Sequence, residues 1–321
     1  MSVPPVTLQI SLAPGDYEHA RVLLRHQCDT WRSQVDEILL TVDFHRSPGR
    51  FSSRWEEGRE KILPLARSIP GTRVLEVDYS PARQTEVANR FFGGEKLPGK
   101  DCRGGPFYSY FFGLNAATHE HVLHSDSDMM FGGRSPHWIH EAIACLQRRP
   151  ELLLTAPLPG PPRADGALVQ LRGERTPGPW LGYDFREMST RIFLIDRRRF
   201  ASDFGMLIAQ RPPLRDCLKA LIGGHPVADL PEHLFTRRMQ ERGLRRHDLL
   251  GSSPGMWTLH PPYRNTSFYE RLPQLLAAVE SGEIPPEQRG DHDLNASMVD
   301  WSDSIAGLRR NRWWRRLLRL T

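Results

Sequence analysis

Two acidic residues, Asp126 and Asp128, end the strand-like run that begins at 121–123 (HVL) in the segment THEHVLHSDSDMMFGG. One serine separates them, and the chain becomes apolar again straight afterwards. In an extended segment, side chains two residues apart point the same way, so this spacing predicts two carboxylates on one side. Two like charges so close together destabilise each other unless a cation neutralises them.

A hard divalent cation, Mn²⁺ or Mg²⁺, is the simplest partner for such a pair, because both ions prefer oxygen ligands. An ion held by few protein ligands keeps coordination positions open for the phosphates of a substrate. We therefore predict a metal site that includes Asp126 and Asp128. The alternative is a solvated loop, since Asp-x-Asp triplets are common in proteins.

The elements that must position this pair alternate between apolar strands and helices. We expect strands at 6–12, 37–44, 73–78, 120–124, 152–156 and 191–196, helices at 16–35, 55–66, 107–118, 136–148 and 229–242, and a long Pro/Gly-rich loop at 157–182. Near-continuous apolar strands separated by helices predict an α/β fold with a Rossmann-like, mixed but mostly parallel sheet and helices on both faces. Ligands bind such sheets at the carboxyl ends of the strands, where Asp43, Asp78 and the acidic pair are expected.

The composition is that of a soluble globular protein, with 39% hydrophobic and 25% charged residues in 321 and a net charge of +5. Four scattered cysteines form no CxxC pair, which argues against a zinc site or a disulfide framework and favours a cytoplasmic setting. The first residues lack the pattern of a signal peptide, and no apolar run reaches the ~18 residues of a membrane span.

The last residues have a different character. The segment 309–320, RRNRWWRRLLRL, sets six arginines against Trp313, Trp314 and three leucines. Wound as a helix, its apolar side chains share an arc of roughly 160°, which predicts a basic amphipathic helix on an anionic membrane surface. The alternative is that the two tryptophans dock on the domain. No nucleic-acid partner is expected, because basic residues elsewhere are interspersed with acids.

Three segments resemble one family. The run LNAATHEHVLHSDSDMMF (114–131) resembles the metal-binding segment of nucleotide-sugar glycosyltransferases of the GT-A fold, particularly the family 2 type. Upstream, CRGGPFYSYFFGLNAA (102–117) is similar to the segment in which those enzymes place glycine and a basic residue before a helix. Downstream, ADLPEHLFTRRMQERGL (228–244) resembles their acid–base segment. The resemblance covers roughly residues 6–262.

The resemblance implies that an acid in the downstream segment is the catalytic base. Glu232 falls at that position, and Asp229 is the competing candidate because Pro231 stands where the family often has a second acid. The base would take the proton of the acceptor hydroxyl, with inversion at the anomeric carbon. The alternative for Glu232 is an exposed residue in the first turn of a helix, stabilised by the helix dipole.

Further positions are implied to bind the donor or the metal. His260 in WTLHPP resembles the histidine that some members add as a metal ligand, and Asp43 resembles the position that contacts the nucleotide base. Arg103, followed by Gly104, is expected to pair with the diphosphate while the glycine admits a close backbone approach. Asp126 would contact the ribose or the metal. The plainer alternatives are a packed histidine, a capping carboxylate and a surface arginine.

These expectations describe a metal-dependent glycosyltransferase that moves a sugar from a nucleotide-diphosphate donor to a carbohydrate, lipid-linked or small-molecule acceptor. The GT-A domain is expected at 1–290, with a nucleotide-sugar half at about 1–135 and an acceptor half at about 136–290, and the tail at 291–321. A lipid-binding tail would place the enzyme peripherally on the inner face of the membrane.

Two rival functions remain open at this point. A sugar-phosphate nucleotidyltransferase is disfavoured by the loop APGDYEHAR after the first strand, which has one glycine and two acids instead of a Gly-rich basic loop. A GT-A-like carbohydrate-binding or scaffold protein without turnover is the other rival.

Overall fold

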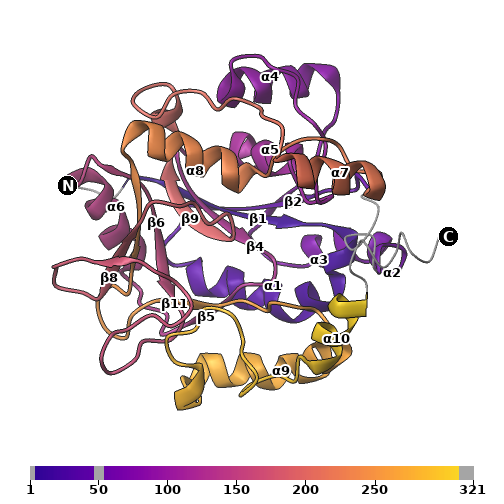
Figure 1. Cartoon of the computed structure of the whole chain (residues 1–321). Coiled ribbons are helices and arrows are strands. Elements are labelled where there is room, and N and C mark those ends of the chain that lie inside the picture. The colour runs from indigo at the N-terminus through magenta and orange to yellow at the C-terminus, as the bar shows by residue number, and fades with distance from the viewer. Residues whose placement is uncertain (1–3, 47–53, 311–321) are drawn as a thin grey trace.

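The computed structural model describes residues 4–46 and 54–310 (Figure 1). Its strands are β1 (Val6–Leu12), β2 (Glu37–Val42), β3 (Arg73–Glu76), β4 (His121–Asp126), β5 (Met130–Gly132), β6 (Leu152–Pro159), β7 (Glu174–Arg175), β8 (Gly182–Phe185), β9 (Ile192–Asp196), β10 (Arg245–Leu249) and β11 (Trp257–Leu259). Its helices are α1 (Tyr17–Trp31), α2 (Trp55–Arg59), α3 (Ile62–Arg67), α4 (Pro81–Phe92), α5 (Tyr108–Ala116), α6 (Trp138–Arg148), α7 (Leu214–Gly223), α8 (Pro231–Arg242), α9 (Thr266–Ser281) and α10 (Ser302–Arg310).

The strands form a mixed sheet in the order β3-β2-β1-β4-β9-β6-β10-β8-β7, and β11 joins β6 to β5 beside it. Within the described residues, all the strands of this path except β9 and β8 run in the same direction. Helices α4, α5 and α8 cover one face, and α1, α3 and α9 lie on the other (Figure 1). The predicted α/β class, with a mostly parallel sheet between helices, is confirmed.

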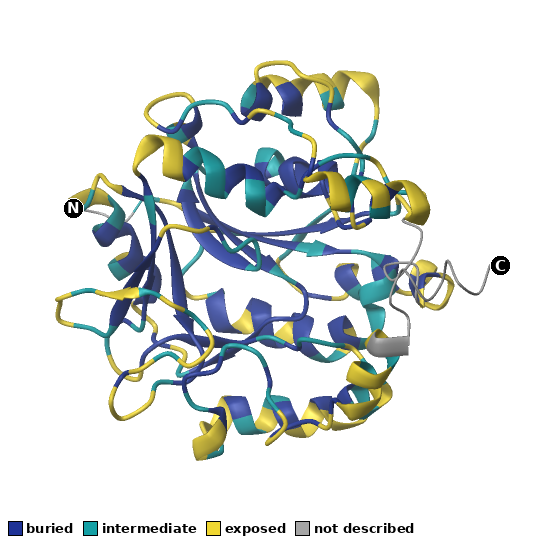
Figure 2. Cartoon of the chain, in the orientation of Figure 1, coloured by how far each residue is buried: buried dark blue, intermediate teal, exposed yellow. Residues whose placement is uncertain are grey.

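The central strands of the sheet are buried on both faces and form the middle of the apolar core (Figure 2). Aromatic side chains dominate the layer under α5 and α8. Phe235 of α8 stacks on Phe111 of α5 with ring centroids 6.1 Å apart. The ring centroids of Phe200 and Phe204 each lie 5.7 Å from that of Phe235. Such a layer fixes α8, and therefore the acidic residues at its amino end, against the sheet.

Phe235→Ala should destabilise the protein by about 3–5 kcal/mol, because a fully buried ring is replaced by a cavity between aromatic neighbours. The free energy of unfolding from urea denaturation measures this effect. Phe235→Leu keeps most of the volume and should cost clearly less. Equal losses for the two substitutions would show that the ring's bulk is not what matters.

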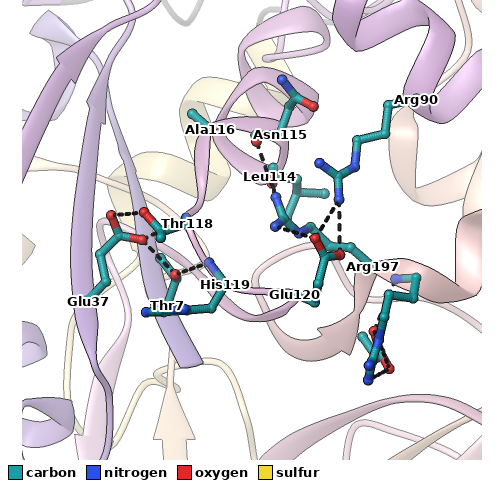
Figure 3. Close-up of polar contacts among 12 residues, drawn as sticks. Thr7, Glu37, Arg90, Leu114, Asn115, Ala116, Thr118, His119, Glu120 and Arg197 are labelled. Atoms are coloured by element: carbon teal, nitrogen blue, oxygen red, sulfur yellow. Dashed lines mark hydrogen bonds and ion pairs between the residues drawn. The ribbon is translucent and has the colours of Figure 1, made fainter. Parts of the chain in front are cut away.

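The amino-terminal edge of the sheet is closed by ion pairs (Figure 3). Arg197, which is 2% exposed, donates to the Leu114 carbonyl oxygen (2.6 Å) and pairs with Glu120 (3.2 Å), which also pairs with Arg90. Burial lowers the pKa of Arg197 to about 10, so it stays charged at neutral pH. With this edge occupied by structural contacts, the opposite, carboxyl edge is where ligands can enter.

Several elements differ from the sequence prediction. The expected helix at 55–66 is two short helices, α2 and α3, and the expected loop at 157–182 contains the end of β6, all of β7 and the start of β8. Helices α4, α7 and α9 were not predicted. The sequence does carry a signal for the start of α4, because a serine followed by a proline is typical of a helix start. In the structure, the Ser80 side chain caps the helix by accepting a hydrogen bond from the Arg83 amide, and Pro81 is the first helical residue.

Beyond residue 290 the chain continues to pack on the domain. Leu294, Met298, Val299 and Trp301 are buried with α9, and the Trp301 indole donates to the Leu294 carbonyl oxygen (2.7 Å). The amphipathic segment predicted at 309–320 lies almost wholly outside the described residues, which end at Arg310. None of the described helices combines the length and apolar character needed to cross a bilayer.

Candidate active site at the carboxyl edge

The carboxyl ends of three parallel strands meet at one place. β1 lies between β2 and β4, in a register that pairs Leu12 with Val42 and Ser11 with Asp126. The loops that follow these strands therefore bring Asp16, Asp43 and the acidic pair to the same edge of the sheet. The sequence predicted this position for Asp43 and the pair.

Asp128 does not lie in an extended segment. The chain turns at residues 127–128, directly after β4, and the Gln27 side chain of α1 holds this turn by donating to the carbonyl oxygens of Asp126 (3.1 Å) and Met129 (2.8 Å). The expectation that both carboxylates point to one side by strand alternation is therefore wrong, because alternation requires extended backbone at both residues. The two carboxylates have different neighbours.

The Asp128 carboxylate is 1% exposed and is neutralised by a guanidinium. Arg264, just before α9, donates to Asp128 Oδ2 from Nη2 (2.5 Å) and Nε (3.2 Å), and its Nη1 lies 3.6 Å from Asp16 Oδ1. Burial acts to raise the pKa of Asp128, but the neighbouring positive charge, chiefly that of Arg264, holds it well below its ordinary range. Asp128 is therefore ionised at any physiological pH.

His260 is the second group beside Asp128. Its Nε2 lies 3.4 Å from Asp128 Oδ2, and its Nδ1 lies 3.1 Å from Asp293 Oδ1. Asp293 also pairs with Arg191 at 3.1 Å. A histidine whose far nitrogen contacts a carboxylate is held in one orientation, so Nε2 is directed at Asp128.

His19 closes the site from the side of α1. Its Nε2 lies 3.0 Å from the Ser127 hydroxyl, and the ring is fully buried. Burial, helped by the Arg264 charge, lowers the pKa of His19 to about 4, so the ring is neutral at pH 7. It therefore adds no positive charge to the cluster.

The donor set fits a hard divalent ion through Asp128 and His260. Asp128 Oδ1 is buried and has no hydrogen-bond partner among the described residues, which is unusual for a charged oxygen. No group of three or more His, Cys, Asp or Glu side chains able to hold a metal occurs in ranges 4–46 and 54–310. An ion here would depend on substrate oxygens for its remaining ligands, and it would compete with Arg264 for Asp128.

Asp126 has different neighbours from Asp128. Its side chain is 39% exposed, and its Oδ1 lies 3.5 Å from His124 Nε2. Its negative charge acts on both Tyr110 and Glu232, which places its carboxylate near the start of α8. The backbone amide of Asp126 is fixed by the Arg191 carbonyl oxygen at 2.7 Å.

Glu232 lies in the first turn of α8, directly after Pro231, and it is partly buried. Burial raises the pKa of Glu232 above its ordinary value, although the positive charges of Arg191, His233 and Arg246 oppose the shift. Within the described part of the chain, no hydrogen bond to its carboxylate occurs. A carboxylate that is partly dehydrated and not engaged can accept a proton from a ligand.

Asp229, the competing candidate, is already engaged. It is 1% exposed and accepts hydrogen bonds from the Leu230 amide (2.9 Å) and from Arg237 (3.4 Å), and His233 Nδ1 lies 2.7 Å from it. These contacts tie the loop before α8 to the helix itself. The Asp229 carboxylate therefore stabilises the fold, and both of its oxygens already have hydrogen-bonding partners within the protein.

Asp43 at the end of β2 is also paired. Lys100 Nζ donates to its Oδ2 (2.7 Å), and the Tyr79 hydroxyl (3.1 Å) and the His45 amide (2.8 Å) donate to its Oδ1. The His45 and Tyr79 rings stack at 4.9 Å beside it. These residues form one polar cluster around Asp43, directly after β2.

Arg103 is exposed, and its loop has its own reason for two glycines. Asp101 Oδ1 accepts hydrogen bonds from the amides of Arg103 (2.7 Å) and Gly105 (2.9 Å), Gly104 has a φ of +78°, and a Cβ on Gly105 would lie 2.6 Å from Asp101 Oδ2. The turn therefore explains the glycines without a ligand. The Cys102 amide donates to the Ala228 carbonyl oxygen (2.8 Å), which places this loop beside the segment before α8.

Sequence reasoning missed the basic members of the site. Arg264, Lys100 and Arg191 each neutralise an acid that the structure brings to this edge, and Asp293 orients His260. Arg264 follows His260 by four residues in HPPYR, and that proximity is the one signal that could have drawn attention to it. The chain has many arginines, so charge alone does not single out Arg264 or Arg191.

Comparison with known proteins gives a limited result. No family model matches the chain, and no curated protein matches it in sequence. Among solved structures, TarS 1–349 of S. aureus in complex with UDP-GlcNAc is similar at 12% identity and a TM-score of 0.39, over 88% of this chain and 68% of that one.

Two further similar structures are of a synthase and a galactosyltransferase. Glucosyl-3-phosphoglycerate synthase of Mycobacterium tuberculosis, with Mn²⁺, UDP and phosphoglyceric acid, has 10% identity and a TM-score of 0.36, over 86% of this chain and 77% of that one. The galactosyltransferase LgtC, with donor and acceptor sugar analogues, has 12% identity and a TM-score of 0.34, over 88% and 98%. Likenesses at this level do not establish a family, so function is inferred below from the site residues.

Proposed function

We propose that the protein is a glycosyltransferase that moves a sugar from a nucleotide-diphosphate donor to an acceptor hydroxyl. The observation that carries the proposal is that a cluster of charged residues and a separate carboxylate with a raised pKa lie at the same edge of the sheet. Asp128, Arg264 and His260 form a charged cluster suited to a diphosphate and its counter-ion. Glu232, near Asp126, is a carboxylate with a raised pKa and no engagement by the described residues.

The donor would bind along the loops after β1, β2 and β4. Asp128 and His260 would hold Mn²⁺ or Mg²⁺, which when bound supplies Lewis-acid stabilisation of the leaving diphosphate. Arg264 would turn from Asp128 to the phosphate oxygens once a cation replaces it, and exposed Arg103 would pair with the diphosphate from the other loop. Asp126 would contact the ribose or the metal, and Asp43 with Lys100 would border the nucleotide base.

The acceptor would bind between Asp126 and the start of α8. Glu232 would take the proton of the attacking hydroxyl as the new glycosidic bond forms, so the sugar is attacked opposite to the leaving diphosphate and its anomeric configuration inverts. Burial raises the pKa of Glu232, and the positive charges of Arg191 and Arg246 oppose this effect and favour the ionised carboxylate. A carbohydrate, a lipid-linked sugar or a small molecule each supplies such a hydroxyl.

A screen of nucleotide-diphosphate sugars by thermal unfolding, with and without Mn²⁺, tests this function. One donor should raise the melting temperature in a concentration-dependent way, and the same donor should be hydrolysed slowly when no acceptor is present. Stabilisation by a nucleoside triphosphate with pyrophosphate release would instead indicate nucleotidyl transfer. Binding without turnover would indicate a carbohydrate-binding protein, and no stabilisation by any donor would contradict the proposal.

The acid limb of the pH profile of kcat/KM should lie above the ordinary glutamate pKa of about 4.3. The base must be ionised, and a raised pKa means that the ionised fraction is lost earlier as the pH falls. Arg191→Gln removes an opposing positive charge and should move this limb to still higher pH, whereas Arg191→Lys should move it less. A limb that stays in place in Arg191→Gln would rule out Glu232 as the group that titrates.

A further inference from the structure

Helix α7 turns its apolar side chains away from the protein. Leu214, Leu218, Leu221 and Ile222 are 85%, 62%, 65% and 55% exposed, whereas Ala220 is the one residue of the helix that is buried. Figure 2 shows the helix as largely exposed. An amphipathic helix normally does the opposite, so this exposed stripe is a feature that the described fold leaves without a partner.

The stripe is continuous along the helix. At about 100° per residue, the four side chains fall within an arc of about 100° that lies opposite Ala220. Arg215 borders this arc, exposed Arg211 precedes the helix, and the nearby Asp216 is neutralised by Lys219 at 2.6 Å. The apolar face thus has a basic border without an unpaired acid beside it.

A second exposed apolar pair lies on α10. Ile305 and Leu308 are 40% and 57% exposed, and both α7 and α10 lie toward the right-hand edge of the molecule in Figure 1. The sequence that follows α10 is rich in Arg, Trp and Leu. Both helices therefore present exposed aliphatic side chains, and α7 has the exposed basic residues Arg211 and Arg215 beside them.

We propose that α7, together with α10, docks on an anionic lipid bilayer. Aliphatic side chains inserted into the interface and arginines beside anionic headgroups are the combination that such a surface binds. A second copy of the chain fits less well, because a ten-residue helix is about 15 Å long and its stripe is far smaller than the roughly 800 Å² per partner of a stable interface.

The docking helix is connected to the proposed acceptor side of the site. Seven residues separate Gly223 at the end of α7 from Pro231 at the start of α8, and Glu232 follows at once. The Asp229 amide donates to the Gln210 carbonyl oxygen (2.9 Å), which fixes both ends of the α7 segment beside the base. Insertion of α7 would bring the acceptor side to the bilayer. Membrane binding itself does not depend on the proposed function, but a lipid-linked acceptor does.

Flotation of the full chain with vesicles tests the inference. The protein should float with vesicles of phosphatidylcholine containing 30% phosphatidylglycerol and much less with phosphatidylcholine alone, and added salt should weaken binding. The triple variant Leu214→Ser/Leu218→Ser/Leu221→Ser should lose at least about tenfold in vesicle affinity with an unchanged melting temperature, because the three side chains are already exposed. Val169→Ser, also at an exposed apolar residue (56%), is the matched control and should bind as the wild type does.

Three results would overturn the inference. They are a wild-type protein that floats with neither vesicle, a triple variant that floats as well as the wild type, and a concentration-dependent dimer in sedimentation that the triple variant abolishes. Donor-induced thermal stabilisation, measured on the same variant, reports the site separately. Loss of flotation with retained donor binding supports the docking role, whereas a protein that floats but binds no donor contradicts only the proposed function.

Discussion

Glu232→Gln is expected to lower kcat by about 10²–10⁴-fold while leaving donor binding intact, because the amide keeps the shape of the side chain but cannot accept the proton. Its position explains why the effect should be confined to turnover. The carboxylate is partly buried in the first turn of α8 and is not hydrogen-bonded to another described residue, so its replacement breaks no hydrogen bond among those residues. Initial rates of sugar transfer, together with thermal shifts by the donor, measure the two quantities.

Asp229→Asn is the matched control, because it changes the competing acid by the same single substitution. Asp229 is bound by the Leu230 amide, His233 and Arg237, so this variant should lose about 1–3 kcal/mol of unfolding free energy. Its turnover per folded molecule should fall much less than that of Glu232→Gln. The reverse ranking would assign the base to Asp229.

Asp128→Asn is expected to lower kcat by about 10²–10³-fold and to abolish any rise in melting temperature produced by Mn²⁺. Asp128 is the buried charge on which Arg264 and His260 converge, and its unpartnered Oδ1 is the oxygen open to a cation. The amide removes the negative charge but preserves the volume. Melting curves recorded over a series of Mn²⁺ concentrations test the binding, and rates of transfer test the catalytic effect.

Arg264→Gln separates the roles of the two cations at Asp128. The guanidinium and a divalent ion compete for one carboxylate, so removal of the arginine should tighten Mn²⁺ binding by at least about fivefold. Turnover should nevertheless fall, because a charge available to the diphosphate is lost. Weaker Mn²⁺ binding in Arg264→Gln would show that the two cations do not compete. Unchanged Mn²⁺ stabilisation in Asp128→Asn would place any ion elsewhere.

The local pattern of the chain was sufficient to predict much of this architecture. β2 is a near-continuous apolar strand, and β1 and β4 are buried strands that carry apolar residues among polar ones. Burial on both faces of a parallel sheet is the physical reason that such runs can be predicted. Asp43 and Asp126 follow from the same logic, since a polar residue that ends a buried parallel strand lies at the carboxyl edge. Helices α7 and α9 were not predicted, although both carry apolar side chains at helical spacing.

Only the tertiary structure decided which charges meet. Asp128 is 136 residues from Arg264 and 132 from His260, and the pairing arises because the turn after β4 and the chain after β11 pack together at one edge. The sequence favoured Glu232 over Asp229 as the base but left the choice open. Burial and hydrogen bonding differ between them, because the fold gives Asp229 three hydrogen-bonding partners and gives the partly buried Glu232 none among the described residues. Local periodicity thus determines strands and their ends, whereas charge neutralisation depends on contacts between distant segments.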